Sequence, residues 1–354
     1  DTHSVLLDLD TNLSDNVDLK TGFMGSYQKN YASNTGVRRL IPDYKKYDFG
    51  IYAVSDYQFN SNWLFEVGAR FDFTYMDVYK FYRTSFWELR NYDENFSNLV
   101  VEELVNQVLT RPQFNYYNGS TTLGATYDFG EDYKLFLNYS IASRTPNPSE
   151  LFSEGLHHST ARIEYGNLEF NSEVGHKLSL TLERINENFN FSINPFINTI
   201  SDFILIEPVG INNSIRGTFP VWEYRQTNAQ LLGIDFNASY VFLEELRFNH
   251  LSSMVKGYDR LQDEPLINIP AINTKNELVY FNPKIKNLRL ALQSEYVFRQ
   301  NEYPDTNFEI YIPQTETSEL VDVSSPPNAY HLLNFNSSID FDFSEKSSLS
   351  LGFG

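Results

Sequence analysis

The 354-residue sequence contains no cysteine. That absence excludes a disulfide framework, a thiolate metal site and a cysteine nucleophile. Long apolar runs are also missing, since no stretch approaches the ~18 residues that a membrane-spanning helix needs. Basic residues are few: 27 Lys and Arg stand against 46 Asp and Glu, which gives a net charge of −19. Such a chain would repel phosphates, so we expect no nucleic-acid partner.

Signals at the two ends are missing as well. The sequence begins DTHSVLLDLD, without an initiator methionine or the basic and apolar segments of a signal peptide. It stops at SLSLGFG, in the middle of an alternating run. We therefore expect residues 1–354 to be a piece of a longer protein.

What the chain does have is aromatic residues, 24 Tyr and 29 Phe, set in alternating patterns. Side chains on a strand point alternately to opposite faces, so a strand between lipid and water alternates apolar with polar residues. One run shows the pattern well: Trp63, Phe65, Val67, Ala69, Phe71, Phe73 and Tyr75, opposed by Glu66, Arg70, Asp72 and Thr74. We count about 14 such strands, of which the first, at His3–Asp10, is weak.

The connections between these strands are alternately short and long. The long ones are expected near Ala32–Lys45, Arg83–Gln113, Thr145–Asn171, Glu207–Pro220, Asp259–Ala271 and Glu302–Asn328. Aromatic residues gather beside the short turns, as in the interfacial girdle of a membrane barrel. The pattern predicts an all-β, antiparallel transmembrane β-barrel with short periplasmic turns and long extracellular loops. Many strands exceed the ~9–11 residues needed to span a bilayer, so they should project on the loop side.

Two alternatives remain open for the architecture. A soluble β-sandwich or solenoid would carry more Lys and Glu on its solvent face than the Asn, Ser and Thr present here. A free-standing barrel of 14 strands is the other. Within the second long loop, Val101, Leu104, Val105 and Val108 have helical spacing and predict a short helix at Asn98–Leu109.

The segment Ser143–Glu173 resembles the signature region of TonB-dependent outer-membrane receptors. Arg144, Thr145 and Pro146 match the family's RAP-like strand end, with Thr in place of Ala. Glu150, Leu151 and Phe152 match its ELY/ELF element. The return begins with Tyr165, Gly166, Asn167 and Leu168, which match a GNP-L-like motif that here lacks its proline.

The resemblance implies a part of a 22-stranded barrel in the bacterial outer membrane, with the plug domain and the terminal strands absent from residues 1–354. It also implies active import of a scarce solute: a metal ion, haem or a ferric siderophore. Energy would come from the TonB–ExbB–ExbD complex, and the wall would meet outer-membrane lipid and lipopolysaccharide. No resident cofactor is expected.

Choosing a ligand depends on two adjacent histidines in this segment. Neutral imidazole is a good ligand for zinc, copper and haem iron, so His157 and His158 are the candidate metal ligands. Glu154 and Glu164 could add oxygen ligands, and Arg144 is a further candidate for ligand binding. A histidine pair without spaced partners is equally compatible with exposed loop residues that bind nothing.

A barrel enzyme would need a Ser/His/Asn or Asp/His constellation, and no motif such as G-x-S-x-G surrounds His250, so we expect no enzyme. A passive porin, or a receptor for carbohydrates or oligopeptides, is the remaining alternative. A basic cluster of Arg38, Arg39, Lys45 and Lys46 in the first long loop could meet lipopolysaccharide phosphates or be merely solvated.

Overall fold

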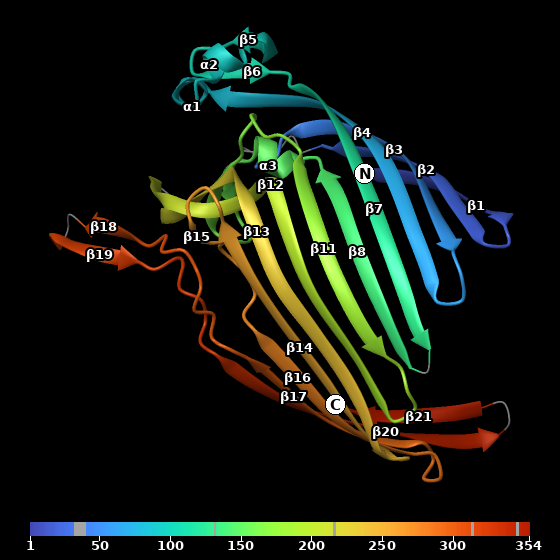
Figure 1. Ribbon diagram of the computed structural model, residues 1–354. Helices are drawn as coiled ribbons and strands as arrows, with labels where there is room; N and C mark the ends of the chain where they lie inside the picture. Colours follow the sequence, from blue (N-terminus) through green and yellow to red (C-terminus); the bar gives the residue numbers. More distant parts are fainter. Residues whose placement is uncertain (32–39, 131, 215–216, 313–314, 345–346) are drawn as a thin grey trace.

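The computed structural model describes residues 1–31, 40–130, 132–214, 217–312, 315–344 and 347–354. Almost all of it is β-strand, wound into one curved, 19-stranded sheet. Fourteen long strands form its wall (Figure 1): β1 (Thr2–Ser14), β2 (Val17–Asn30), β3 (Asp43–Gln58), β4 (Trp63–Arg83), β7 (Gln113–Gly130), β8 (Tyr133–Arg144), β11 (Glu173–Arg184), β12 (Phe189–Ser214), β13 (Gly217–Leu243), β14 (Leu246–Asp259), β16 (Asn273–Asn282), β17 (Leu288–Val297), β20 (Tyr330–Ser344) and β21 (Ser347–Phe353).

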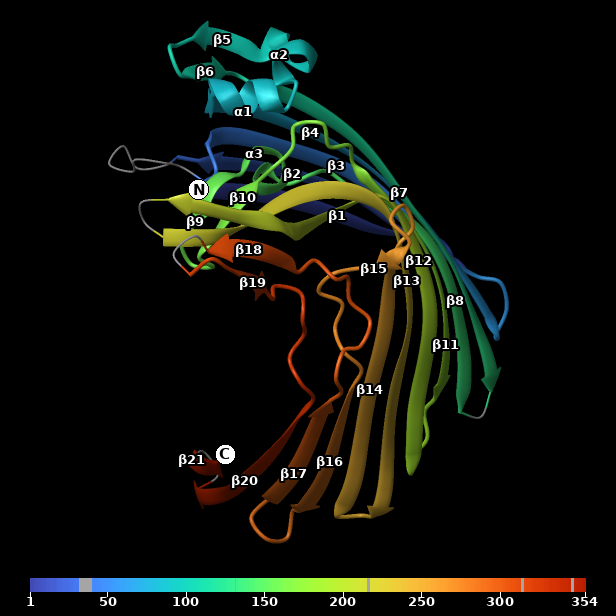
Figure 2. The same ribbon diagram turned by 90° about the vertical axis from the view of Figure 1, so that its left-hand side faces the viewer.

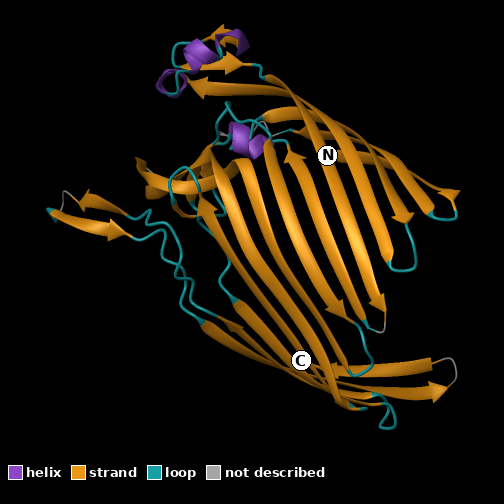
Figure 3. Cartoon of the chain, viewed as in Figure 1, coloured by secondary structure: helices purple, strands orange, loops and turns teal. Residues whose placement is uncertain are grey.

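The smaller elements all belong to the long connections. They are α1 (Thr84–Leu89), α2 (Tyr92–Asn95), η1 (Ser97–Leu99), β5 (Val100–Glu103), β6 (Gln107–Thr110), α3 (Pro148–Phe152), β9 (Glu154–His157), β10 (Arg162–Tyr165), β15 (Glu264–Pro265), β18 (Phe308–Ile312) and β19 (Thr317–Val321). Figure 3 shows the helices confined to one end of the wall. No helix in the described part of the chain is both long and apolar enough to cross a bilayer.

Each long strand pairs antiparallel with the next long strand along the chain, from β1–β2 to β20–β21. The predicted number of strands and their antiparallel order are therefore confirmed. The strand predicted to be weak at His3–Asp10 is a full one, because all of it pairs with β2. Within the described residues β1 and β21 do not pair with each other, and Figure 2 shows the wall curving around an open interior.

The outward face of the wall carries the apolar rows that the alternation predicted. On β4 the side chains of Phe65, Val67 and Phe71 are 40%, 53% and 49% exposed. Beside the short turn, the ring of Trp63 stacks on Phe65 at 5.6 Å and lies 4.7 Å from Tyr127 on the neighbouring strand. Exposed apolar rows ending in packed aromatic rings are what a wall in contact with lipid requires.

One predicted long loop is a strand hairpin instead. Residues Glu207–Pro220 were expected to be a loop, but β12 and β13 stay paired until Ser214 meets Gly217. Local sequence missed this because Pro208 and Gly210 read as loop residues. The structure accommodates them as a register shift between Pro208 and Gly210.

The helix expected at Asn98–Leu109 is also wrong. Only the single turn η1 is helical there, and the antiparallel pair β5–β6 follows it. Its supposed apolar face does not exist, since Val108 is 5% exposed and Val105 is 95% exposed. β-branched residues favour strands, and β6 gains a second partner in the end of β4.

The inward face of the wall has two different parts. Midway along the strands it is polar, as expected for a wet interior: Arg70 pairs with Asp72 at 2.6 Å, and Thr74 donates to Asp48 at 2.7 Å. Near the long loops it is dry. The main buried cluster lies there: Met76, Val78, Tyr82, Phe86, Trp87, Tyr92, Val108, Leu151, Phe152, Leu168, Phe170 and Ile204.

Candidate functional site

Residues 145–172, between β8 and β11, fold back onto the inward face of the wall. Figure 1 shows α3 from this segment lying against the ends of the long strands. Leu151 and Phe152 of α3 are 1% and 0% exposed in the same apolar cluster as Met76 and Val78 of β4. The signature segment is therefore part of the core at the long-loop end, and its position is fixed by packing.

A short cap starts α3. Pro148 occupies its first turn, and Asn147 and Glu150 form a reciprocal capping box in which the amide of Asn147 donates to Glu150 Oε2 at 2.6 Å. A five-residue helix is too short to be stable alone, so this cap and the burial of its side chains hold it in place.

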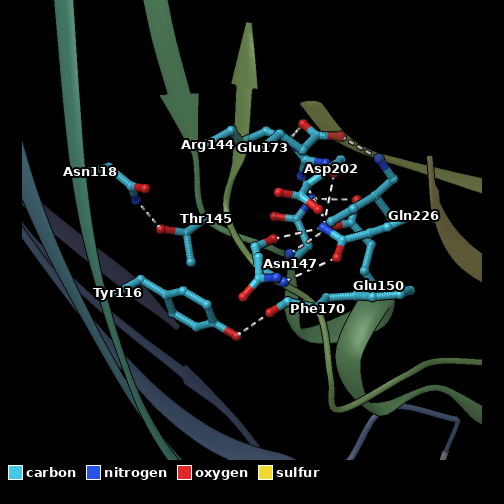
Figure 4. A network of polar contacts seen from close by, with 12 residues as sticks. Tyr116, Asn118, Arg144, Thr145, Asn147, Glu150, Phe170, Glu173, Asp202 and Gln226 are labelled. Carbon is cyan, nitrogen blue, oxygen red and sulfur yellow. Dashed lines mark hydrogen bonds and ion pairs between the residues drawn. The ribbon is translucent and has the colours of Figure 1, made fainter. Parts of the chain in front are cut away.

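Arg144 connects the start and the end of the segment. Its Nη1 donates to Glu150 at 3.1 Å and its Nε to Glu173 at 2.5 Å (Figure 4). The other oxygen of Glu173 accepts from the backbone amide of Ile204 at 2.6 Å. Sequence reasoning placed Arg144 among the ligand-binding residues, but the structure engages its guanidinium with two carboxylates of the fold.

The return motif passes close beneath α3. A side chain on Gly166 would lie 2.6 Å from the carbonyl oxygen of Glu150, so only glycine fits there. Tyr92 donates its hydroxyl hydrogen to Asn167 at 2.9 Å and accepts from the amide of Leu168 at 3.2 Å. The motif residues thus join loop 84–112 to loop 145–172.

The β9–β10 hairpin separates the predicted ligands onto two faces. Arg162 pairs with His157, and Glu164 pairs with Gly155, so these side chains share one face. Glu154 pairs with Tyr165 and therefore points to the other face. His158 lies in the turn that follows β9 and is exposed.

His157 is held by a buried carboxylate. Its Nδ1 lies 2.8 Å from Oε1 of Glu164, a side chain only 4% exposed, while the imidazole itself is 39% exposed. The same oxygen accepts from Arg162 Nε at 2.7 Å. Such a contact fixes the orientation and tautomer of the ring, with Nε2 as its other nitrogen. Across the described residues, no group of three or more His, Cys, Asp and Glu is arranged to hold a metal ion.

Glu154 belongs to a different cluster, around Lys80 of β4. Lys80 Nζ lies 3.2 Å from Glu154 and donates to the carbonyl of Phe152 at 2.7 Å, with its side chain 5% exposed. Arg83 reaches the same carboxylate at 3.6 Å. Burial lowers the pKa of Lys80, and the charge of Glu154 partly offsets that effect. These contacts hold the end of α3 against β4.

The hairpin also links two loops through a strand pairing that sequence order does not suggest. β10 runs parallel to β13, with Ile163, Glu164 and Tyr165 opposite Val221, Trp222 and Glu223. The guanidinium of Arg162 lies 4.7 Å over the ring of Trp222. Arg90 of loop 84–112 pairs with Glu223 at 2.8 Å. Three long connections therefore form one packed cap.

Sequence reasoning did not single out Lys80, Tyr92, Glu150, Glu173 and Trp222 as site residues. Of these, only Glu150 left a local signal, because Asn147 and Glu150 have capping-box spacing. Lys80 stands in an alternating run, and nothing nearby indicates that a loop will cover it. Arg38 and Arg39 of the predicted basic cluster lie outside the described residues; Lys46 pairs with Asp48 at 3.0 Å.

A second cluster of polar contacts joins β13 to the long-loop end of β14. Asp259, 1% exposed, accepts from Arg225 Nη1 at 2.7 Å, from Thr227 and from the backbone amide of Leu261 at 2.9 Å. Burial by itself would raise the pKa of Asp259, but these hydrogen bonds outweigh it and the pKa lies below its ordinary value.

Low pH is expected to weaken these contacts of Asp259. A lowered carboxyl pKa contributes stability that is complete above the ordinary value of 3.8 and is lost as the pH falls through the folded pKa. The hydrogen-exchange protection factors of residues 259–265 should therefore fall as the pH drops below 3.8. Asp259→Asn should abolish this pH dependence of the protection factors. Asp263→Asn, which removes an exposed carboxylate from the same turn, is the control and should leave it intact.

Comparison with known proteins decides the family. The model described as "TonB dependent receptor-like, beta-barrel" matches residues 1–354. The chain belongs to this family. Its members are outer-membrane proteins of bacteria, so the predicted fold and location are confirmed. The family is one of transport receptors rather than enzymes. None of the curated proteins matches the sequence.

Solved structures of similar fold include two transporters and a receptor. The copper transporter OprC is 14% identical with a TM-score of 0.71, over 99% of this chain and 50% of its own. The FrpB iron transporter of Neisseria meningitidis (F3-3 variant) is 14% identical with a TM-score of 0.59, over 96% and 47%. The Serratia marcescens hemophore receptor HasR, in complex with its hemophore HasA and heme, is 12% identical with a TM-score of 0.63, over 99% and 55%.

These likenesses establish the fold of the receptor barrel. The chain spans about half the length of the structures it matches. At such identities the ligands named for those proteins are properties of those proteins alone.

Proposed function

We propose that the full protein is an active-transport receptor that binds a metal-containing solute on its extracellular loops and imports it with energy from the TonB–ExbB–ExbD complex. The solute class comprises metal ions, haem and ferric siderophores. The remaining strands of a 22-stranded barrel and a plug domain belong to the same proposal. The family match over 1–354 supports the receptor, and His157 supports the choice of solute.

The observation that carries the solute class is the contact between His157 and Glu164. Histidines that bind metals usually donate their other ring N–H to a carboxylate or carbonyl, which orients the ring and raises its basicity. Here the 2.8 Å contact of Nδ1 with a buried carboxylate leaves Nε2 to bind a metal. One imidazole suits a metal that already carries other ligands, such as haem iron or a chelated ion.

The other predicted residues receive different roles in this proposal. Glu164 positions His157, and exposed His158 is an additional donor for a solute that arrives from outside. Glu154 and Arg144 act indirectly, because their ion pairs hold α3 and the hairpin against the wall. Lipopolysaccharide contacts the outer surface of the barrel.

Removing the imidazole tests the proposal. We expect His157→Ala to weaken binding of haem or of zinc to the purified full-length protein by about a hundredfold, and Glu164→Gln to weaken the same binding by about tenfold. Isothermal titration with hemin and with zinc chloride measures both. His331→Ala is the matched control, since this exposed histidine lies on β20, outside the 145–172 segment, and contacts Ser294.

Circular dichroism of each variant shows whether the barrel has folded. Unchanged affinity of folded His157→Ala for both probes would exclude haem and metal ions bound through His157. A receptor for a ferric siderophore, a carbohydrate or an oligopeptide would then be favoured if the full-length protein carries a plug, and a passive porin if it does not.

A further inference from the structure

The outward face of the wall contains a hollow of about 490 Å³. It crosses five neighbouring strands, β3, β4, β7, β8 and β11. Its lining is mostly apolar: Ser55, Tyr57, Phe65, Glu66, Val67, Leu123, Gly124, Ala125, Leu137, Tyr139 and Leu178. Because these strands are neighbours within this chain, the hollow needs no further strand to complete it.

The strand register shows that the hollow lies on one face. Directly paired residues share a face. One row crosses the wall through Ser55, Val67, Leu123, Tyr139 and Leu178, and the next through Tyr57, Phe65, Ala125 and Leu137. Glu66 and Gly124 pair with each other between the two rows, and the alternation of side chains along β4 turns the side chain of Glu66 inward.

Small residues produce the depression. Ser55 interrupts the apolar alternation of β3, and Ala125 stands between Phe65 and Leu137 in its row. The apolar side chains of Val67, Leu123 and Leu137 surround these small residues and are 53%, 55% and 46% exposed. The side chains form walls that enclose a groove without filling it.

Its depth in the membrane follows from the strand ends. Every lining residue lies seven or fewer residues from the end of its strand at a short turn. With ~3.3 Å per residue and a tilt of ~45°, that is within about 16 Å of the turn, or half of the ~30 Å hydrocarbon core. Short turns are periplasmic in this class of barrel, so the groove faces the inner leaflet.

We propose that this groove binds one acyl chain of a phospholipid from the periplasmic leaflet. Five strands at ~4.8 Å spacing give it a length of about 19 Å, and its inclination of ~45° gives a rise of about 13 Å, close to the depth of one leaflet. It is continuous with the lipid-facing wall, so hydrocarbon is what it meets. Tyr57 and Tyr139 belong to its lining, and the hydroxyl group of Tyr139 contacts Nδ1 of His176 at 2.9 Å.

A bulkier side chain on the floor of the groove tests this site. The protein purified from outer membranes in mild detergent should retain phospholipid in native mass spectrometry, and Ala125→Phe should reduce that retention by about tenfold, since the ring displaces two or more methylenes. Ala69→Phe adds the same ring to the same face, paired with Ala53 outside the groove, and should leave retention unchanged.

A second measurement needs no variant. A phospholipid with a photoreactive diazirine on one acyl chain, reconstituted with the wild-type protein, should crosslink to residues 65–67 and 123–125. Crosslinks spread evenly over the outward face, or equal phospholipid retention in Ala125→Phe and Ala69→Phe, would overturn the site. Retention of lipopolysaccharide instead of phospholipid would equally refute it, because that lipid occupies the outer leaflet.

Discussion

A Lys80→Met variant is expected to lose the protection of residues 145–172 against proteases while its barrel stays intact. Methionine keeps the volume of the stem but removes the ammonium group that bonds Phe152 and Glu154. Breaking a buried pair on one side costs about 3–5 kcal/mol, because a desolvated charge is left behind. Arg83 remains near Glu154 at 3.6 Å, so we expect the lower end of this range, about 3 kcal/mol, in local stability.

Limited proteolysis and hydrogen exchange of the 145–172 segment measure the effect. Lys134→Met is the control: its pair with Asp128 is 3.4 Å long, and the lysine is 48% exposed, so a loss of about 0–1 kcal/mol is expected. If Lys80→Met left the segment as protected as in the wild type, the apolar packing of α3 alone would hold the loop.

Gly166→Ala should disturb the same segment from its other side. The added methyl group would lie 2.6 Å from the carbonyl oxygen of Glu150 and 2.7 Å from the carbonyl carbon of Leu151. Backbone cannot move aside as a flexible side chain does, so α3 and the return segment must separate. We expect a local loss of about 2–3 kcal/mol or more, with weaker protection of the β10–β13 pairing.

Gly119→Ala is a matched control in the same barrel, because no heavy atom lies within 4 Å of the added methyl group. Hydrogen exchange at Ile163–Tyr165 should change in the first variant and not in the second. Equal protection in both would mean that the contact between the return motif and α3 relaxes without cost.

Loss of loop protection and loss of metal binding are separable results. Lys80 and Gly166 act on how the segment is held, whereas His157 acts through an imidazole that is 39% exposed. A variant of Lys80 that binds hemin normally would show that the loop keeps its hairpin even when α3 loosens.

Local pattern predicted the wall of the barrel well. In a strand the side-chain period is two, so each strand, its lipid-facing row and its short turns are encoded in consecutive residues. The failures came where two local signals competed. Val101 and Val108 have helical spacing but β-branched side chains, and the pairing of β5 with β6 and of β6 with β4 decided for strand. Pro208 and Gly210 read as loop, yet the hairpin absorbs them.

The candidate site was only partly accessible to sequence reasoning. The motif around Ser143–Glu173 identified the right segment and the family. It could not show that Arg144 is engaged by Glu150 and Glu173, or that Glu154 and Glu164 point to opposite faces of a hairpin. Those facts depend on strand register and on partners that are not neighbours in the sequence, such as Glu173, which lies 29 residues from Arg144.

The sequence by itself determined that this chain is an outer-membrane barrel, because alternation is a property of neighbouring residues and needs no partner. Tertiary structure alone decided which side chains are free to meet a solute. Lys80 is buried only because α3 folds onto it, and His157 is oriented only because β10 brings Glu164 to its ring. Burial and ion pairing are relations between distant segments, and they exist only after the loops have packed.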